Sequence, residues 1–190
     1  MRYKDDNKKE NIFHATIDLI NEIGFSEISM SKIAKKAGVS ASTIYIYFEN
    51  KEDMINKLYL TIKQKMIEEI FKGVEGVPSI KAGFELALGN FVNFILNHEN
   101  YFLFSEQFVN APMIKHLKDQ DQKNLFQPVW ELFERGKAQG IFKPVSTELL
   151  IEFSYAPMIQ LIKKHYSGEF NFDQQQINNV VAIIWDGITV

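Results

Sequence analysis

The sequence predicts an all-α protein in which a small N-terminal head of three helices precedes a larger helical bundle. Three observations support this class. Apolar residues recur at helical spacing along most of the chain, strand-like alternation is scarce, and Gly, Pro and polar clusters separate the apolar stripes. With 190 residues, 46% of them apolar, the chain is long enough to bury a sizeable core in one or two domains.

Capping residues define the first helices. An apolar stripe near the N-terminus ends at Gly24, because glycine is typical of helix C-termini. Ser29 is placed to cap a short second helix that ends at Gly38. Ser40 is placed to cap a short third helix, and Asn50 to begin a long fourth one. The sequence therefore predicts a compact helical head over residues 1–50.

The remainder of the chain contains longer helices. The stretch KGVEGVPS, residues 72–79, carries two glycines and a proline and is the clearest internal break. Helical segments follow at about residues 79–97, 101–117, 120–138, 146–166 and 173–189. We expect these segments to form the bundle, within a second domain over residues 51–190.

Several classes of protein are excluded by composition. The chain has no cysteine, so it forms neither disulfides nor thiolate zinc sites. The four histidines (His14, His98, His116 and His165) are scattered, with no pair at metal-ligand spacing. No Gly-rich phosphate loop and no G-x-S-x-G motif occur. We therefore expect no enzyme, no cofactor and no metal.

The chain also lacks the marks of a membrane or secreted protein. The first residues, MRYKDDNKKENIFH, are charged and have no apolar core typical of a signal peptide. The longest charge-free run, Leu86 to His98, spans 13 residues and is too short to cross a bilayer. A cytoplasmic protein with no membrane partner is expected.

Charge is distributed unevenly. The net charge of the chain is −3, yet the stretch from Met30 to Phe48 contains three lysines and no carboxylate. Two short helices joined by Gly38-Val39-Ser40 within this stretch match a helix-turn-helix, whose second helix enters the major groove of DNA. An acidic body with one small basic face is compatible with DNA contact by that face alone.

Helical geometry sorts the residues of the third helix. Ile44, Tyr47 and Phe48 group on one side, and Ser42, Tyr45 and Ile46 group on the other. Hydroxyls can donate to phosphate oxygens or base edges, and apolar groups can contact a thymine methyl. The alternative is that the two tyrosines are ordinary core-edge residues and the three lysines a solvated face.

The stretch ISMSKIAKKAGVSASTIYIYFENKEDMI resembles the N-terminal signature of the TetR family of bacterial transcriptional regulators. The pieces that match are IA..AGVS, S.TIY.YF and KE.M, within a resemblance that covers roughly residues 12–60. It implies a homodimer that binds a palindromic double-stranded DNA operator. It also implies the DNA-binding residues Ser29, Ser31, Ser40, Ala41, Ser42, Thr43, Tyr45, Tyr47 and Lys51.

The expected roles of these residues follow from the resemblance. Ser40 and Thr43 would contact backbone phosphates, Ala41, Ser42 and Tyr45 would face bases or the adjoining backbone, and Tyr47 and Lys51 would hold phosphates. The family often has Gly where this chain has Ser42, so the operator sequence cannot be taken from relatives.

The bundle is rich in aromatic residues, and the resemblance implies that it holds a small hydrophobic ligand. The candidate ligand-binding residues are Phe84, Leu88, Phe91, Phe94, Phe102, Phe108, Trp130, Phe133, Tyr155 and Met158. The alternative for each of these residues is a place in the plain core. The resemblance also implies a dimer through residues 146–189, and segment 146–166 supports it because it is apolar on nearly all sides.

The function predicted from these features is a ligand-responsive transcriptional regulator, more specifically a repressor released from DNA by its ligand. Two other functions stay open. One is a helical small-molecule-binding protein whose head docks on another protein, and the other is an enzyme with an unrecognised site. Salt-dependent binding to DNA separates the first function from both alternatives.

Overall fold

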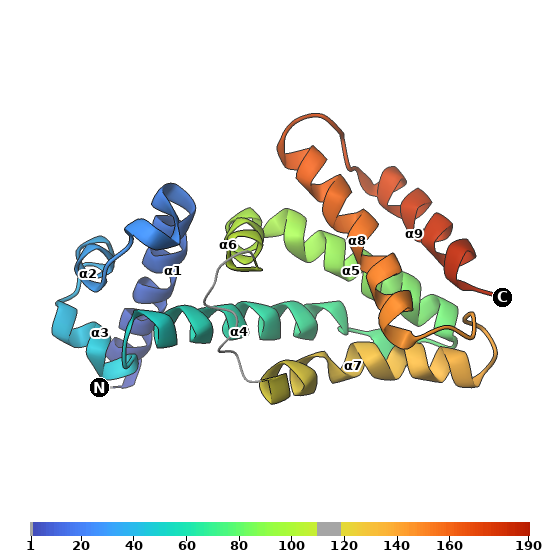
Figure 1. Cartoon of the computed structure of the whole chain (residues 1–190), viewed down its shortest axis with the longest axis horizontal. Coiled ribbons are helices and arrows are strands. Elements are labelled where there is room, and N and C mark those ends of the chain that lie inside the picture. The colour runs from blue at the N-terminus through green and yellow to red at the C-terminus, as the bar shows by residue number, and fades with distance from the viewer. Residues whose placement is uncertain (1, 110–118) are drawn as a thin grey trace. The chain divides into compact units, whose positions relative to one another are not determined.

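The computed structural model describes residues 2–109 and 119–190. Over these residues the structure consists of helices without a strand (Figure 1), which confirms the all-α class. The helices in chain order are α1 (Arg2–Glu27), α2 (Met30–Ala37), α3 (Ala41–Tyr47), α4 (Lys51–Ile70), the short 3-10 helix η1 (Val74–Gly76), α5 (Ile80–Asn97), α6 (Glu99–Val109), α7 (Asp119–Ala138), α8 (Thr147–Tyr166) and α9 (Gln174–Ile188).

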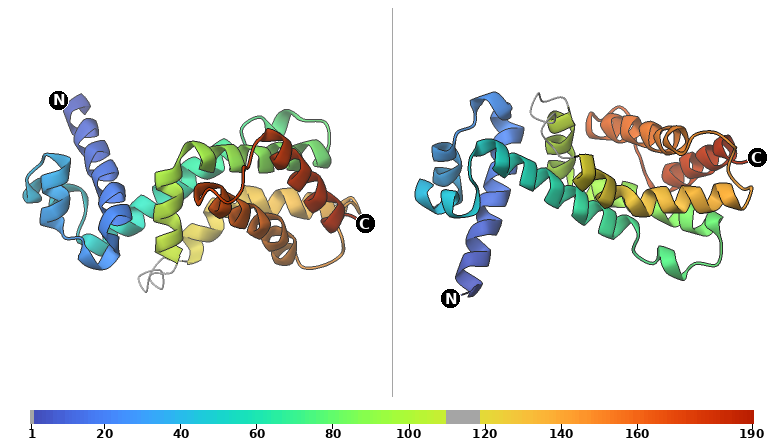
Figure 2. Two further views of the ribbon diagram at one scale, coloured as in Figure 1. Left: turned by 90° about the horizontal axis from the view of Figure 1, so that it is seen from above. Right: turned by 60° about the horizontal axis from the view of Figure 1, so that its bottom comes forward.

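The chain divides into two compact units. The N-terminal unit comprises Met1–Lys63 and His98–Asp119, and the C-terminal unit comprises Gln64–Asn97 and Gln120–Val190. Within the N-terminal unit α2 packs on α1 and α3 packs on α2, an arrangement that Figure 2 shows from two further sides. Helix α4 is divided between the units, with residues 51–63 in the N-terminal unit and residues 64–70 in the C-terminal unit.

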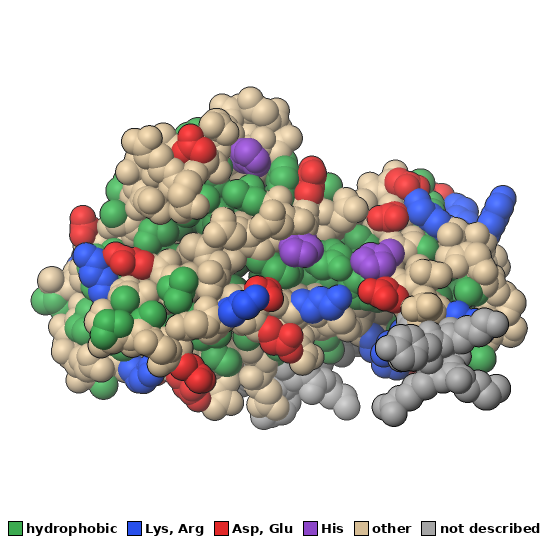
Figure 3. All heavy atoms as spheres, turned by 180° about the vertical axis from the view of Figure 1, so that it is seen from behind, with side chains coloured by type: hydrophobic (Ala, Val, Ile, Leu, Met, Phe, Trp, Pro, Cys, Tyr) green, Lys and Arg blue, Asp and Glu red, His purple; other side chains and the backbone are tan. Residues whose placement is uncertain are grey.

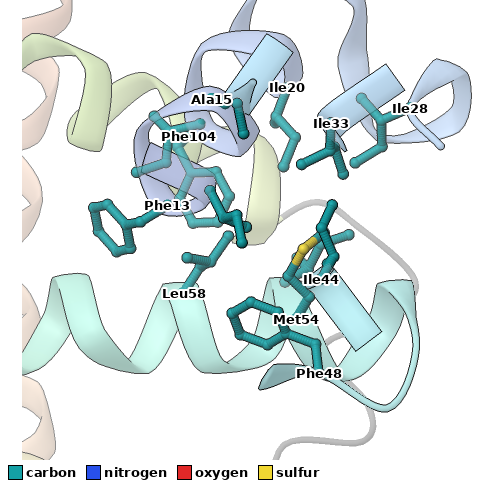
Figure 4. Packing of buried hydrophobic residues seen from close by; sticks show 14 of the residues in the cluster. Phe13, Ala15, Ile20, Ile28, Ile33, Ile44, Phe48, Met54, Leu58 and Phe104 are labelled. Atoms are coloured by element: carbon teal, nitrogen blue, oxygen red, sulfur yellow. The ribbon is translucent and has the colours of Figure 1, made fainter. Parts of the chain in front are cut away.

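The core of the N-terminal unit is formed by apolar side chains from five helices. Figure 4 shows these side chains pointing toward one another from α1, α2, α3, α4 and α6. The fully buried members include Ile12, Ile17, Ile20, Ile33, Ile44, Met54, Ile55, Phe104 and Phe108. Gly24 has a φ of 77°, and this non-helical backbone interrupts α1 at the position where the sequence predicts the helix to end.

Helix α6 belongs to the N-terminal unit, whereas the sequence placed the predicted helix 101–117 in the bundle. The ring of Phe25 lies 5.8 Å from Phe104 and 6.1 Å from Phe108. Tyr59 stacks on Phe108 at 4.1 Å between ring centroids. The burial of these rings on α1 and α4 explains where α6 packs. The predicted residues 110–117 lie outside the described part of the chain.

The C-terminal unit is built around α5, which packs against η1, α8 and α9. Aromatic rings from three helices and one loop meet in its core: Phe84 lies 6.0 Å from Phe133, 6.0 Å from Phe142 and 5.4 Å from Trp185. The hydroxyl of Tyr166 donates a hydrogen bond of 2.7 Å to the Ile95 carbonyl, which ties α8 to α5. Helical spacing in the sequence predicted α5, α7, α8 and α9 to within one residue of their observed bounds.

Charged and apolar side chains are interspersed on the surface, as the face in Figure 3 shows. In the described part of the chain, no helix has the length and apolar character needed to cross a membrane. Among the side chains that the structure describes, no three His, Asp or Glu residues are grouped so that they could hold a metal ion.

Candidate nucleic-acid interface

The turn between α2 and α3 has the backbone geometry of a helix-turn-helix. Ser29 caps α2, and its hydroxyl accepts a hydrogen bond of 3.3 Å from the Lys32 N–H. The helix ends at Gly38, whose φ of 67° lies in the left-handed region that favours glycine. The N–H of Val39 closes the turn by donating to the Ala34 carbonyl at 3.0 Å. Both predicted caps of α2 are confirmed.

Three hydroxyls gather at the start of α3. The Ser40 hydroxyl accepts a hydrogen bond of 3.2 Å from the Thr43 N–H, which confirms Ser40 as the cap. The same oxygen lies 2.8 Å from the hydroxyl of Ser42 and 2.8 Å from that of Thr43. These hydroxyls are on the surface, where each can rotate to donate to a phosphate oxygen.

The two faces of α3 differ sharply in burial. Ile44 is fully buried, and Phe48, directly after the helix, is also buried. Tyr45 and Ile46 are 56% and 76% exposed, and Ser42 is exposed beside them. The outward grouping of Ser42, Tyr45 and Ile46 predicted from helical geometry is therefore confirmed, and this exposed face offers a hydroxyl, a phenol and an aliphatic group.

The remaining candidate residues surround this face. Ser29 and Ser31 are exposed at the start of α2. Ala41, Thr43 and Tyr47 are half-buried. Ile46 is more exposed than Tyr45, yet the predicted DNA-binding set leaves it out. The helical period is the signal that identifies it, because that period already placed Ile46 beside Tyr45.

The lysines near the turn differ in their surroundings. Lys32 donates a hydrogen bond of 2.7 Å to the Glu27 carbonyl, and Lys36 forms an ion pair with Glu22. Lys35 is exposed. The ammonium of Lys51 lies 3.4 Å from the carbonyl oxygens of Phe25 and of Ile28. Lys51 is half-buried and contacts the end of α1 and the connection that follows it.

The start of α4 is fixed by a reciprocal pair of hydrogen bonds. The Asp53 N–H donates to the Asn50 side chain at 2.8 Å, and the Glu49 N–H donates to the Asp53 carboxylate at 3.0 Å, as in a capping box. Burial acts to raise the pKa of Asp53, but hydrogen bonds from Lys57 and the Glu49 N–H outweigh it and hold the pKa below its usual value. These hydrogen bonds fix the backbone between the end of α3 and the start of α4.

The candidate ligand-binding residues are divided between the two units. Phe102 and Phe108 are buried in the N-terminal unit. The others lie in the C-terminal unit, where Phe84, Phe91, Phe94, Phe133 and Met158 are buried and Leu88 and Tyr155 are half-buried. Phe91 and Tyr155 are in ring contact at 5.2 Å. Trp130 is 42% exposed, which separates it from the buried members of the set.

Comparison with known proteins covers both units. The family profile described as bacterial regulatory proteins, tetR family, matches residues 12–58. The profile described as tetracyclin repressor-like, C-terminal domain, matches residues 80–189. An uncharacterized HTH-type transcriptional regulator of Haemophilus influenzae is 24% identical over 99% of this chain and 99% of its own length.

Two solved structures illustrate the likeness in fold. A TetR family transcription regulator from Marinobacter aquaeolei has a TM-score of 0.90 and 26% sequence identity, and the match covers 100% of this chain and 99% of that one. The transcriptional regulator FadR from Bacillus subtilis, in complex with stearoyl-CoA, has a TM-score of 0.80 and 20% identity, with 94% and 98% covered. The second likeness concerns the fold alone.

Proposed function

The chain belongs to the TetR family of transcriptional regulators, and from this premise we propose that it is a repressor that binds a palindromic operator as a homodimer and is released by a small hydrophobic ligand. Membership of the family makes it a DNA-binding regulator of the helix-turn-helix type and not an enzyme. The observation that carries the finer proposal is the exposed face of α3, opposite the buried Ile44.

In the proposed complex α3 lies in the major groove. The hydroxyls of Ser40 and Thr43 contact backbone phosphates, while Ala41, Ser42 and Tyr45 face base edges or the adjoining backbone. Ser29, Ser31 and Tyr47 contact phosphates at the edge of the groove. The side chain of Lys51 contributes positive charge to the head, and its hydrogen bonds to two carbonyls hold the α1–α2 connection in place.

The proposed division of roles places DNA binding in residues 1–50 and ligand binding and dimerisation in residues 51–190. The aromatic residues buried in the C-terminal unit support an apolar ligand there. FadR from Bacillus subtilis, which shares this fold, was solved with stearoyl-CoA bound. A ligand releases the repressor if it binds more tightly to the conformation that does not fit the operator.

We expect tight, salt-sensitive retention of one palindromic fragment when the protein is titrated by fluorescence anisotropy against DNA from the neighbourhood of its own gene. Affinity should fall roughly 1,000-fold between about 50 and 200 mM salt if about six phosphates are contacted, because bound counterions are released.

Tyr47→Phe should weaken binding to all fragments alike by about threefold to tenfold. Ser42→Ala should instead change the preferred base at one position.

Lys72→Gln is the matched control for these titrations, because Lys72 is exposed and lies in the C-terminal unit. It should leave affinity and salt dependence unchanged. A salt slope near zero would refute the groove-binding role of α3. Equal, weak binding to every fragment would favour a head that docks on another protein.

An apolar surface on α8 and α9 supports the proposed dimer. Leu149 and Phe153 lie one turn apart on α8 and are exposed. Ile183 and Gly187 lie one turn apart on α9, with Ile183 exposed. The Phe153 ring rests beside Gly187, where an added Cβ would lie 3.0 Å from it, so the two helices present one continuous surface. Exposed apolar surfaces of this kind mark protein–protein contacts.

Phe153→Glu is expected to convert the dimer to a monomer, since a carboxylate in the apolar contact would be buried without a partner. Dissociation should be favoured by at least about 100-fold, measured by sedimentation equilibrium, and operator affinity should fall with it. Glu152→Gln, at the exposed neighbouring position, should leave the dimer intact. A Phe153→Glu protein that remains dimeric would place the dimer contact elsewhere.

A further inference from the structure

Lys63 on α4 is a buried lysine that neither the core nor the DNA-binding face requires. It retains 7% of its exposed surface, whereas lysines almost never reach this degree of burial unless they are paired. Its ammonium lies 5.3 Å from the centre of the Tyr59 ring. Among the described residues, no carboxylate forms an ion pair with Lys63 and no acceptor takes a hydrogen bond from it.

The surroundings of Lys63 are mainly aromatic. Tyr59 stacks on Phe108 of α6, and burial raises the pKa of the Tyr59 phenol to about 12. Burial lowers the pKa of Lys63 to about 8, although the negative charge of Glu106 on α6 acts in the opposite direction. The ammonium therefore occupies a site of low polarity. The negative charge of Glu106 offsets only part of the cost of burying it.

A second polar group without a partner lies on the same face of α4. The side-chain oxygen of Asn56 is buried and has no hydrogen-bond donor among the described residues. Positions 56, 59 and 63 follow one another along one face of a helix. Two buried polar groups without a hydrogen-bond partner among the described residues, Asn56 and Lys63, therefore lie on this face of α4.

We propose that Lys63 binds the carboxylate of a monocarboxylic acid with an apolar body. This inference rests on the proposed function, because it identifies the chemical class of the ligand. An ammonium in surroundings of low polarity binds an anion more strongly than it would in water. A carboxylate would supply the acceptor that Lys63 lacks.

The charge at the site favours a carboxylate over a polyanion. Lys63 offers one positive charge, and the only other described charge that affects it is the carboxylate of Glu106. One carboxylate can pair with the Lys63 ammonium beside Glu106, whereas the several phosphate charges of a coenzyme A thioester would need more cations than Lys63 supplies. The proposed ligand is therefore a free acid with an apolar body, and not the thioester.

The test compares straight-chain carboxylates from hexanoate to octadecanoate with the matched alcohols and coenzyme A thioesters, measured by isothermal titration calorimetry on the full-length protein. Wild type should bind at least one acid more tightly than its alcohol by about 10- to 100-fold. Lys63→Met should abolish that preference and leave alcohol binding unchanged. Lys65→Met, at an exposed position of the same helix, should behave as wild type.

The pH dependence separates binding by Lys63 from a structural role. Acid affinity should fall by up to tenfold per pH unit above about pH 8, because the amine must then take up a proton before it pairs with the acid. Alcohol affinity should not change over this range, since Tyr59 stays neutral there. Thermal unfolding of Lys63→Met checks that the variant is folded.

Three results would overturn the inference: acids that bind Lys63→Met as tightly as wild type, alcohols or thioesters that bind wild type more tightly than the acids, or a wild-type protein that binds no acid. None of them bears on the operator titration described above. If the protein retains its operator and a neutral molecule releases it, the proposed function stands and the inference about Lys63 fails.

Discussion

Phe108→Ala is expected to lower the free energy of unfolding by about 3–5 kcal/mol, which is the usual loss when a fully buried phenylalanine is truncated. Phe108 is fully buried. Its ring stacks on Tyr59 and lies against the rings of Phe25 and Phe104, so the substitution opens a cavity among aromatic groups that cannot close around an alanine. Urea denaturation followed by circular dichroism measures the change.

Leu103→Ala is the control for this experiment, because Leu103 lies on the same helix with more than a third of its surface exposed. We expect it to lower the free energy of unfolding by no more than about 1 kcal/mol. If both variants lost the same stability, Phe108 would not be part of the core that joins α6 to α1 and α4.

Lys63→Met is expected to stabilise the protein by about 3 kcal/mol near pH 7. The pKa of Lys63 is about 8 in the folded protein and 10.5 for an ordinary lysine, so the folded state binds fewer protons than the unfolded state between these values. The penalty for burying the ammonium is therefore fully present below about pH 8, and it disappears as the pH rises toward 10.5. Methionine removes this penalty at every pH.

Urea denaturation of wild type and Lys63→Met across this pH range tests the expectation. The difference in stability should be largest near pH 7 and should vanish near pH 10.5, while Lys65→Met should show no such trend. A Lys63→Met protein that is less stable than wild type at pH 7 would mean that the ammonium has a stabilising partner. A lysine retained at a loss of stability is a common mark of a binding site.

The sequence predicted those features of the head that depend on near neighbours. Ser29, Gly38 and Ser40 were identified as caps because a cap acts on residues within one turn of itself. The exposed face of α3 followed from the helical period alone, since seven residues in a regular helix leave little freedom in which side Tyr45 occupies.

Features that depend on contacts between distant segments could not be predicted. Nothing in the local pattern of residues 98–109 shows that α6 packs on α1 rather than on the helices of the C-terminal unit. For this reason the sequence groups Phe102 and Phe108 with residues that lie in the C-terminal unit. The burial of Lys63 could not be predicted either, because a lysine beside an apolar stripe is usually at the surface. Only the packing of α6 against α4 places Lys63 in the interior.

The N-terminal unit is discontinuous along the chain, and this has a consequence for protein synthesis. The ribosome releases residues 1–63 well before α6, so the apolar surfaces that later contact Phe104 and Phe108 stay uncovered while the intervening segment is translated. The DNA-reading head reaches its final packing only after Val109 has emerged. A polypeptide truncated before α6 would carry the recognition helix on an incomplete core. We expect such a fragment to bind DNA more weakly than the full-length protein does.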